Sequence, residues 1–493
     1  GTRINEPTVG LYVDDIPYFD KATFNFNLYD ISRIEILKGP QGTLYGRNSL
    51  GGLIKMYTED PKNYANTEIS LGYGNFDKRN IFLKQHLPLV KNKIQMSLSG
   101  NYSYENGYYE NVFHDQMIGG ENNFAGRMKL DYTLSKSADM HFIIDASKNR
   151  NNGYPYSMTD NGHSLQDISY NHESKYLRDL ATTGLVFNKR WENIRLKSIS
   201  AFQMVNDIQD IDQDFTSMKL FNVLQNRENR FYTQEINLFS NNQSRVNYVG
   251  GVFAYYQSRD KQVDVNYGED AVSMFKLPGE MTKYKTYDKD IYGTAIFGQL
   301  TYKDLFLDGL KFTAGLRYAY EKTRLDYLYE LGVMGNKSVQ DELDETMEKP
   351  VWLPKASIHY SWNRNVANYA TVTRGYKSGG FNSTIEDPEY ETFGPEFATN
   401  YEVGMKGSFL KRRLNINSAF YYIDWKDQQV YQPVPSGQGS MLLNAGESHS
   451  MGAELELKFR PISNLVFFSN FAYTEAKYDK YQRDTETNYS GNF

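Results

Sequence analysis

Apolar and polar residues alternate with a period of two along most of this chain, from residue 66 onward. The alternation is clearest in residues 124–134, 401–409 and 451–459, where one face is apolar and the other carries charges such as Lys129 and Glu454. Successive side chains of a β-strand point to opposite faces of a sheet, so this period predicts strands. The polar face is too charged for the core of a soluble sandwich. We therefore expect an apolar face against lipid and a charged face toward a wet lumen.

Short and long connections alternate between the expected strands. Such alternation is typical of antiparallel neighbours that cross a membrane, with short turns on the periplasmic side and longer loops outside. The pattern gives about seventeen strands of about ten to fifteen residues before Tyr478, and because the count is odd we expect further strands after Phe493. Short turns are expected at residues 88–92, 135–139, 190–193, 241–245, 303–309, 362–365, 410–413 and 461–464, and longer loops near 105–122, 150–175, 215–226, 264–287, 328–350, 377–399 and 430–445.

A glycine-dense segment, residues 33–54, precedes the strands. Such a density of glycine predicts several tight turns with positive φ, where a side chain would clash. A nucleotide-phosphate loop is excluded because Gly46 is followed by Arg47 and Asn48 instead of Lys and Ser or Thr. No repeated βαβ pattern follows, which excludes a dinucleotide-binding domain. The glycines expected to form these turns are Gly39, Gly42, Gly46, Gly51 and Gly52.

Composition narrows the class of protein further. The 493 residues have a mean hydropathy of −0.64 but are 15% aromatic, with 41 Tyr, so the rings need a structural role such as girdles at membrane interfaces. No apolar run reaches roughly 18 residues, which excludes a transmembrane helix. The net charge of −6 argues against a nucleic-acid partner, and the lack of Cys excludes disulfides and thiolate metal sites.

Two stretches in the first 61 residues carry a family resemblance. YVDDIPY (residues 12–18) and DISRIEILKGPQGTLYGRNSLGGLIKMYTEDP (residues 30–61) resemble the plug domain of TonB-dependent outer-membrane receptors. Segments of the strand-rich part resemble the barrel of the same family: AGLRY (314–318), TRGYKSGGFN (373–382), PEFATNYEVGMKGSF (395–409) and GAELELKFRP (452–461).

The resemblance implies an all-β transmembrane fold, an antiparallel 22-stranded barrel that an N-terminal α+β plug closes. Residues 1–65 would then be the C-terminal half of the plug with its linker, and residues 66–493 about seventeen strands of the barrel. On this reading the chain is truncated at both ends. The TonB box, the first half of the plug and the last strands would lie outside the sequence.

The implied function is active import of a ferric siderophore or similar iron complex across the outer membrane of a Gram-negative bacterium. Substrate would bind between plug apex and outer loops, and TonB with ExbB and ExbD would supply energy from the inner membrane. The barrel would be monomeric in outer-membrane lipid.

Haem, cobalamin or an oligosaccharide are alternative substrates. A passive porin or adhesin is the alternative of another class, although a porin has no reason to carry the plug. No cofactor is expected. The sequence shows neither a nucleophile constellation nor paired carboxylates, so an enzyme is not expected.

The resemblance also assigns roles to individual residues. Arg33, Glu35 and Arg47 occupy positions where the family places charges that pair with the barrel wall, and burial of such charges is tolerable when they are paired. An aromatic loop occupies the place of the plug's apical loops, where its rings would stack on a ligand or pack against the barrel. Its residues are Tyr18, Phe19, Phe24 and Phe26.

The segment 373–382 combines cations with rings. Arg374, Tyr376, Lys377 and Phe381 suit an anionic, partly aromatic ferric chelate, although the motif could instead only shape the strand and its loop.

Two further sets concern metals. The acidic run of Asp210, Asp212 and Asp214 could offer oxygen ligands to Ca²⁺ or simply line a hydrated lumen. A haem receptor would need an axial His, for which the loops offer His114, His163, His172 and His449.

Overall fold

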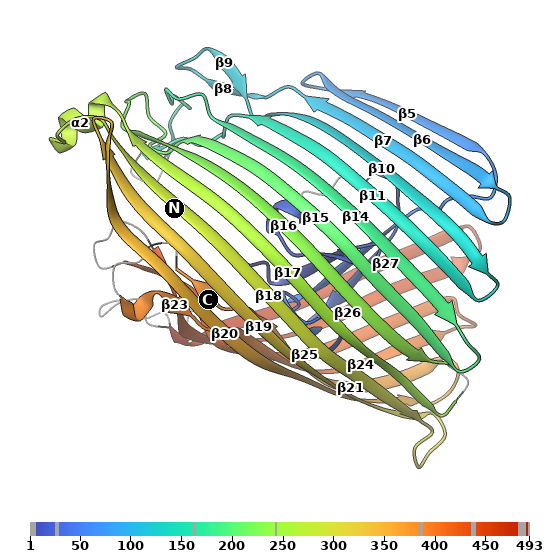
Figure 1. Ribbon diagram of the computed structural model, residues 1–493. Helices are drawn as coiled ribbons and strands as arrows, with labels where there is room; N and C mark the ends of the chain where they lie inside the picture. The colour runs from blue at the N-terminus through green and yellow to red at the C-terminus, as the bar shows by residue number, and fades with distance from the viewer. Residues whose placement is uncertain are drawn as a thin grey trace.

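The computed structural model of the protein describes residues 6–24, 29–160, 164–241, 244–382, 384, 388–434, 440–481 and 490–491. A barrel of seventeen long strands surrounds a small four-stranded sheet, which Figure 1 shows in blue inside the barrel. Among the residues described, no helix has the length and apolar character needed to cross a membrane.

The seventeen strands follow one another round the barrel in chain order, and each pairs with its neighbour antiparallel. The predicted all-β antiparallel architecture and the strand count are therefore confirmed. The strands are β5 (Asn66–Gly74), β6 (Lys78–Val90), β7 (Ile94–Glu105), β10 (Gly120–Ser135), β11 (Ala138–Asn152), β14 (Lys175–Arg190), β15 (Ile194–Asp212), β16 (Phe221–Ser240), β17 (Val246–Tyr267), β18 (Met281–Lys303), β19 (Leu310–Val333), β20 (Asn336–Ser361), β21 (Val366–Lys377), β24 (Glu396–Phe409), β25 (Leu414–Pro433), β26 (Ser440–Ile462) and β27 (Leu465–Tyr481).

The first and last strands of this barrel, β5 and β27, lie at its seam. In the ranges that the structure describes, no register of paired residues joins them, whereas every other neighbouring pair has one. Both strands are exposed on both faces, as Leu71 and Phe468 illustrate.

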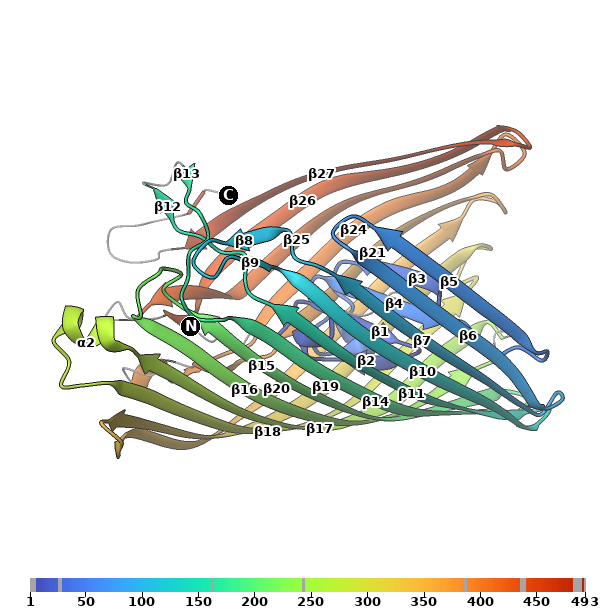
Figure 2. The ribbon, with the colours of Figure 1, turned by 90° about the horizontal axis from the view of Figure 1, so that it is seen from above.

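The connections divide between the two ends of the barrel. Figure 2 shows the short turns gathered at the right-hand end and the longer excursions at the left-hand end. The excursions carry the small elements β8 (Tyr109–Asn111), β9 (Gln116–Ile118), β12 (Thr159–Asp160), β13 (Ser164–Leu165), α2 (Glu269–Phe275), β22 (Gly380–Phe381), η2 (Pro388–Tyr390) and β23 (Thr392–Phe393).

Two expected loops are largely strand instead: 328–350 and, in its described residues, 430–445, which belongs to β25 and β26. Residues 328–350 belong mostly to β19 and β20, which meet at a tight turn where Met334 and Gly335 have φ of 49° and 85°. β20 is 26 residues long, well beyond the expected ten to fifteen. The sequence of the hairpin is polar and charged over residues 336–346, so it lacks the apolar alternation by which strands were recognised.

The small sheet consists of β1 (Val9–Val13), β2 (Ile16–Tyr18), β3 (Ile31–Lys38) and β4 (Gly52–Thr58), in the order β2-β1-β4-β3. β1 runs parallel to β4, and the other two pairs are antiparallel. A 3₁₀ turn, η1 (Lys21–Phe24), follows β2, and a short helix, α1 (Gly42–Tyr45), lies between β3 and β4.

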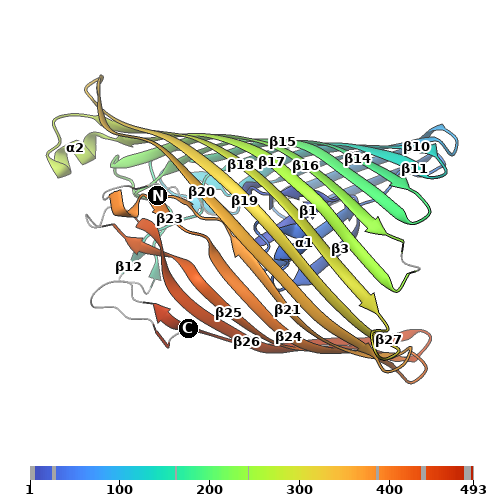
Figure 3. The same ribbon diagram turned by 60° about the horizontal axis from the view of Figure 1, so that its bottom comes forward.

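Apolar packing holds one side of the small sheet against the barrel. Leu11, Val13 and Ile16 are buried in one cluster with Ile143 and Leu180 of the wall. Figure 3 shows the sheet and α1 enclosed by the strands of the wall. Burial of a large aliphatic side chain stabilises by about 1.5–3 kcal/mol, so this face contributes substantially to docking.

The alternation along the strands has the predicted sense. Phe124, Ile296 and Phe420 point outward and are exposed, whereas Lys129 and Arg259 point inward and are buried. Water does not fill the whole lumen, because the small sheet occupies part of it. Many inward charges therefore face protein.

Candidate functional site

Arg47 lies at the centre of the contact between the small sheet and the wall. α1 ends at Tyr45, and Gly46, with φ of 69°, turns the chain so that Arg47 reaches the barrel. Its guanidinium lies 3.6 Å from the Glu321 carboxylate and donates to the Tyr255 hydroxyl at 3.1 Å. The Arg47 side chain is buried, so water does not compete with these charge-assisted contacts.

Glu6 completes this cluster from the chain segment before β1. Its carboxylate lies 3.0 Å from Arg47 and 3.3 Å from Arg259 of β17. Burial by itself would raise the pKa of Glu6, but the charges of Arg47 and Arg259 outweigh burial and lower the pKa to about 2. Glu6 therefore joins the segment before β1 to both the small sheet and the wall.

This pKa shift predicts that acid loosens the small sheet. The ordinary pKa is 4.5, so the stabilisation from ionised Glu6 is fully present above that pH and is lost as the pH falls toward about 2. The loss corresponds to about 3 kcal/mol. Hydrogen exchange of the β1 and β4 amides between pH 5 and pH 2 would measure it. Glu6→Gln should flatten the acid-dependent part of the exchange profile. An unchanged profile in that variant would contradict the assignment of this pH dependence to Glu6.

A second cluster surrounds Asp20, which follows β2. Its carboxylate accepts from Arg227 at 3.2 Å and from Asn229 of the wall, while Arg227 also pairs with Asp207. The preceding Phe19 packs against Phe231, Phe253 and Tyr255. This corner of the sheet is therefore held by a buried ion pair and an aromatic cluster together.

Other ion pairs join the sheet to the wall nearer the turn end of the barrel. They involve Lys84 with Asp30, Lys129 with Asp14 at 3.5 Å, Lys197 with Asp15, and Lys38 with Glu454 at 2.6 Å. The alternating pattern marks all these residues as inward or loop-borne charges, but nothing local in the sequence indicates their partners.

Of the three charges expected to pair with the wall, only Arg47 reaches it. Arg33 and Glu35 lie 3.1 Å apart on the exposed side of β3, and Arg33 lies over the Tyr57 ring. In the part of the chain that the structure describes, neither has an ion pair or hydrogen bond to the barrel. The structure does not support that part of the prediction, because β3 is an edge strand of the plug sheet and the side chains of Arg33 and Glu35 are exposed on it.

The aromatic loop is mostly in contact with protein. Tyr18 and Phe19 are buried against the wall, and Phe24 packs at the edge of the same cluster as Leu11. Phe26 lies outside the described residues. Of the two roles left open for this loop, the geometry favours packing against the barrel over stacking on a ligand.

The residues of segment 373–382 are also engaged by protein. Arg374 lies over the Phe397 ring at 4.2 Å, and Lys377 is buried 3.1 Å from Glu396. The backbone of Tyr376 pairs with that of Arg47. Phe381 is buried in a cluster with Tyr287 and Tyr327 of the wall.

The five glycines differ in what their positions require. Gly39, Gly46 and Gly52 have positive φ, and a Cβ on Gly42 would lie 2.5 Å from the Arg374 carbonyl oxygen. Gly51 has neither feature, because its nearest neighbour would lie 3.5 Å from a Cβ.

The acidic run folds a loop instead of gathering around an ion. Asp212 accepts from the amides of His172 and Phe215, and Asp214 accepts from those of Thr216 and Phe221. Across the described ranges no group of His, Asp and Glu has an arrangement that could hold a metal ion. The calcium hypothesis for Asp210, Asp212 and Asp214 is therefore not supported.

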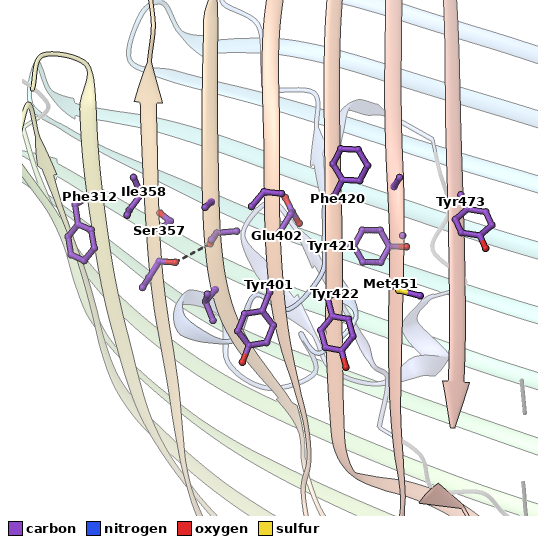
Figure 4. Close-up of a pocket in the computed structure, with 17 residues that line it drawn as sticks. Phe312, Ser357, Ile358, Tyr401, Glu402, Phe420, Tyr421, Tyr422, Met451 and Tyr473 are labelled. Carbon is purple, nitrogen blue, oxygen red and sulfur yellow. Dashed lines mark hydrogen bonds between the residues drawn. The ribbon is translucent and has the colours of Figure 1, made fainter. Parts of the chain in front are cut away.

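An apolar groove of about 770 Å³ runs over the outer face of the barrel wall, from β19 to β27. Figure 4 shows the rings of Phe312, Tyr401, Tyr422 and Phe420 spread over neighbouring strands. By alternation these side chains point opposite to the buried Leu353, toward the lipid. A substrate site needs convergent polar groups, and this groove is almost wholly apolar, so it belongs to the membrane-facing surface.

Two family models match the chain. Residues 97–493 match the TonB dependent receptor-like β-barrel, and residues 3–53 match the TonB-dependent receptor plug domain. The pesticin receptor of Yersinia pestis is 25% identical over 468 residues, which cover 92% of this chain and 64% of that protein. The chain thus spans less than two thirds of the length of this relative.

Solved structures share the fold. The ferric yersiniabactin uptake receptor FyuA from Yersinia pestis superimposes with a TM-score of 0.81 at 22% identity, covering 98% of this chain and 72% of that one. The siderophore receptor PiuA from Acinetobacter baumannii gives a TM-score of 0.75 at 15% identity, covering 98% and 74%.

The four-stranded sheet is thus a plug and the seventeen strands are the barrel around it. The chain belongs to the TonB-dependent receptor family of Gram-negative outer-membrane proteins.

Proposed function

We propose that the protein imports a ferric siderophore or a similar iron complex across the outer membrane, with energy supplied through TonB by ExbB and ExbD. Substrate binds on the loop side of the plug. The work of transport comes from the inner membrane, and the receptor itself performs no chemistry.

The observation that carries this proposal is the plug inside the lumen. Its charges are paired with wall residues, as in Arg47 with Glu321 and Asp20 with Arg227. Such pairs hold an element in one place. They can still break and be replaced by contacts with water when the element moves. A passive porin would gain nothing from a stopper of this kind, so the plug favours gated import.

The choice of an iron complex rests on relatives. Several similar proteins carry names of siderophore receptors, among them FyuA, PiuA and the ferric-pyoverdine 358 receptor of Pseudomonas putida, which is 27% identical over 152 residues covering 30% of this chain and 18% of its own length. Haem gains no support from the histidines expected in loops. His114 contacts the carbonyl oxygen of Asn171, and His172 contacts the carboxylate of Asp210. His449 lies in β26 instead of a loop and contacts Asp479, and His163 lies outside the described residues.

Growth of a deletion strain on single iron sources tests the proposal. We expect growth on at least one ferric siderophore to be lost and to be restored by the complete gene in the presence of TonB, but not in a strain without TonB. Unimpaired growth on every ferric complex, with loss of growth on cobalamin or a glycan, would contradict it.

A further inference from the structure

Lys261 and Lys289 lie on the lumenal wall, paired in strand register with Arg227 and Arg259, which contact Asp20 of the plug and Glu6; this contact region is called the plug's apex. Lys261 of β17 lies between Arg227 and Tyr287 in neighbouring strands. Lys289 of β18 lies in the adjacent inward row, opposite Arg259. Both side chains are buried, at 5% and 9% exposure.

The cations around these two lysines are already matched with carboxylates. Arg227 pairs with Asp20 and Asp207, and Arg259 pairs with Glu6. By contrast, in the described ranges neither Lys261 nor Lys289 lies within ion-pair distance of a carboxylate or makes a hydrogen bond.

The plug adds a further positive charge at the same place. Lys21 of η1 is exposed beside Asp20, and within the described part of the chain no carboxylate lies within ion-pair distance of it. The cations Lys21, Arg47, Arg227, Arg259, Lys261 and Lys289 therefore outnumber the carboxylates Glu6, Asp20, Asp207 and Glu321 around the apex.

Rings surround the two wall lysines. The Lys261 ammonium lies 5.5 Å from the centre of the Tyr287 ring, and Tyr287 lies 4.9 Å from Tyr327. Phe381 packs in the same cluster as these tyrosines. A ring face partly compensates an ammonium but does not neutralise it, so the local excess of positive charge remains.

A buried ammonium without a counter-ion is costly, and a bound anion removes that cost. We propose that Lys261 and Lys289 select iron complexes that carry net negative charge, with aromatic donor groups packed against Tyr287, Tyr327 and Phe381. This inference rests on the proposed function and names the charge class of its substrate. A catecholate complex has the required chemistry, whereas a neutral hydroxamate complex lacks it.

Binding of two ferric complexes to the purified receptor tests the inference. The probes are a ferric tris-catecholate, which is an anion, and a ferric tris-hydroxamate, which is neutral. We expect tighter binding of the anion, and a loss of about tenfold for each of Lys261→Met and Lys289→Met with the anion only. The control is Lys322→Met, which removes an exposed lysine paired with Glu348 at 3.4 Å.

The outcomes separate this inference from the proposed function. Equal binding of both complexes, or equal weakening of both by the lysine variants, overturns charge selection while leaving iron import intact. Binding of neither complex also overturns the inference, whereas import of iron is decided by the growth experiment. Unchanged thermal unfolding of the variants shows that a lost affinity does not come from misfolding.

Discussion

Arg47→Met is expected to weaken docking of the plug by about 3–5 kcal/mol, because it leaves buried carboxylates without their cation. The carboxylates of Glu6 and Glu321 lie 3.0 Å and 3.6 Å from the guanidinium and would lose this partner without gaining water. Hydrogen exchange of the β1 and β4 amides should accelerate by two or more orders of magnitude, on the order expected from that energy. Exchange in the barrel strands should change little.

Arg324→Met is the matched control. Arg324 also pairs with a carboxylate, Asp344 at 2.9 Å, but the pair is exposed on the hairpin of β19 and β20. An exposed pair contributes about 0–1 kcal/mol, so this variant should leave exchange in the plug unchanged. Neutralising the stranded groups, with Glu6→Gln and Glu321→Gln added to Arg47→Met, should restore part of the docking. Equal exchange in the Arg47 and Arg324 variants would show that the buried cluster does not hold the plug.

Gly52→Val is expected to disrupt the plug through its backbone. Gly52 has φ of 149°, and a Cβ there would lie 2.6 Å from the Leu37 carbonyl oxygen of the paired strand. Backbone strain costs about 1–3 kcal/mol and overpacking a similar amount, so a loss of about 3 kcal/mol or more is expected. Gly46→Val should also destabilise, because Gly46 has φ of 69° and a Cβ would lie 2.7 Å from the Arg317 guanidinium.

Gly51→Val provides the comparison at the adjacent residue. Its φ is not positive, and the nearest atom to a Cβ would lie 3.5 Å away. Plug docking and substrate uptake should therefore stay close to those of the unchanged protein. The measurement is protease resistance of the plug in intact cells or in purified receptor. If the Gly52 and Gly51 variants behaved alike, the glycines would not be needed for the turns.

Docking therefore depends on two kinds of feature. Turn geometry, as at Gly52, lets the plug fold, and buried ion pairs, as at Arg47, attach it to the wall. The two variants should be distinguishable, because Glu6→Gln and Glu321→Gln should restore part of the amide protection that the Arg47 variant loses but none of the protection that the Gly52 variant loses.

The sequence by itself determined the class of fold and the number of strands. Alternation of side chains between two faces follows from the geometry of each strand, so it can be read locally, as in residues 124–134. The same reasoning failed for residues 328–350, because the polar and charged stretch 336–346 interrupts the apolar alternation there. The glycine segment could be recognised because φ and close packing limit which residue fits a turn.

Only the tertiary structure decided which charges hold the plug. Arg33 and Arg47 occupy the same glycine-rich neighbourhood, yet Arg33 lies exposed on an edge strand and Arg47 reaches Glu321 on β19. The ion pair depends on how the plug is turned inside the barrel and on the register of distant strands. Lys261 was likewise indistinguishable from any lumenal charge until strand pairing placed it between Arg227 and Tyr287. Local patterns encode which face a residue occupies, but partners across a lumen are set by long-range packing, which no local pattern contains.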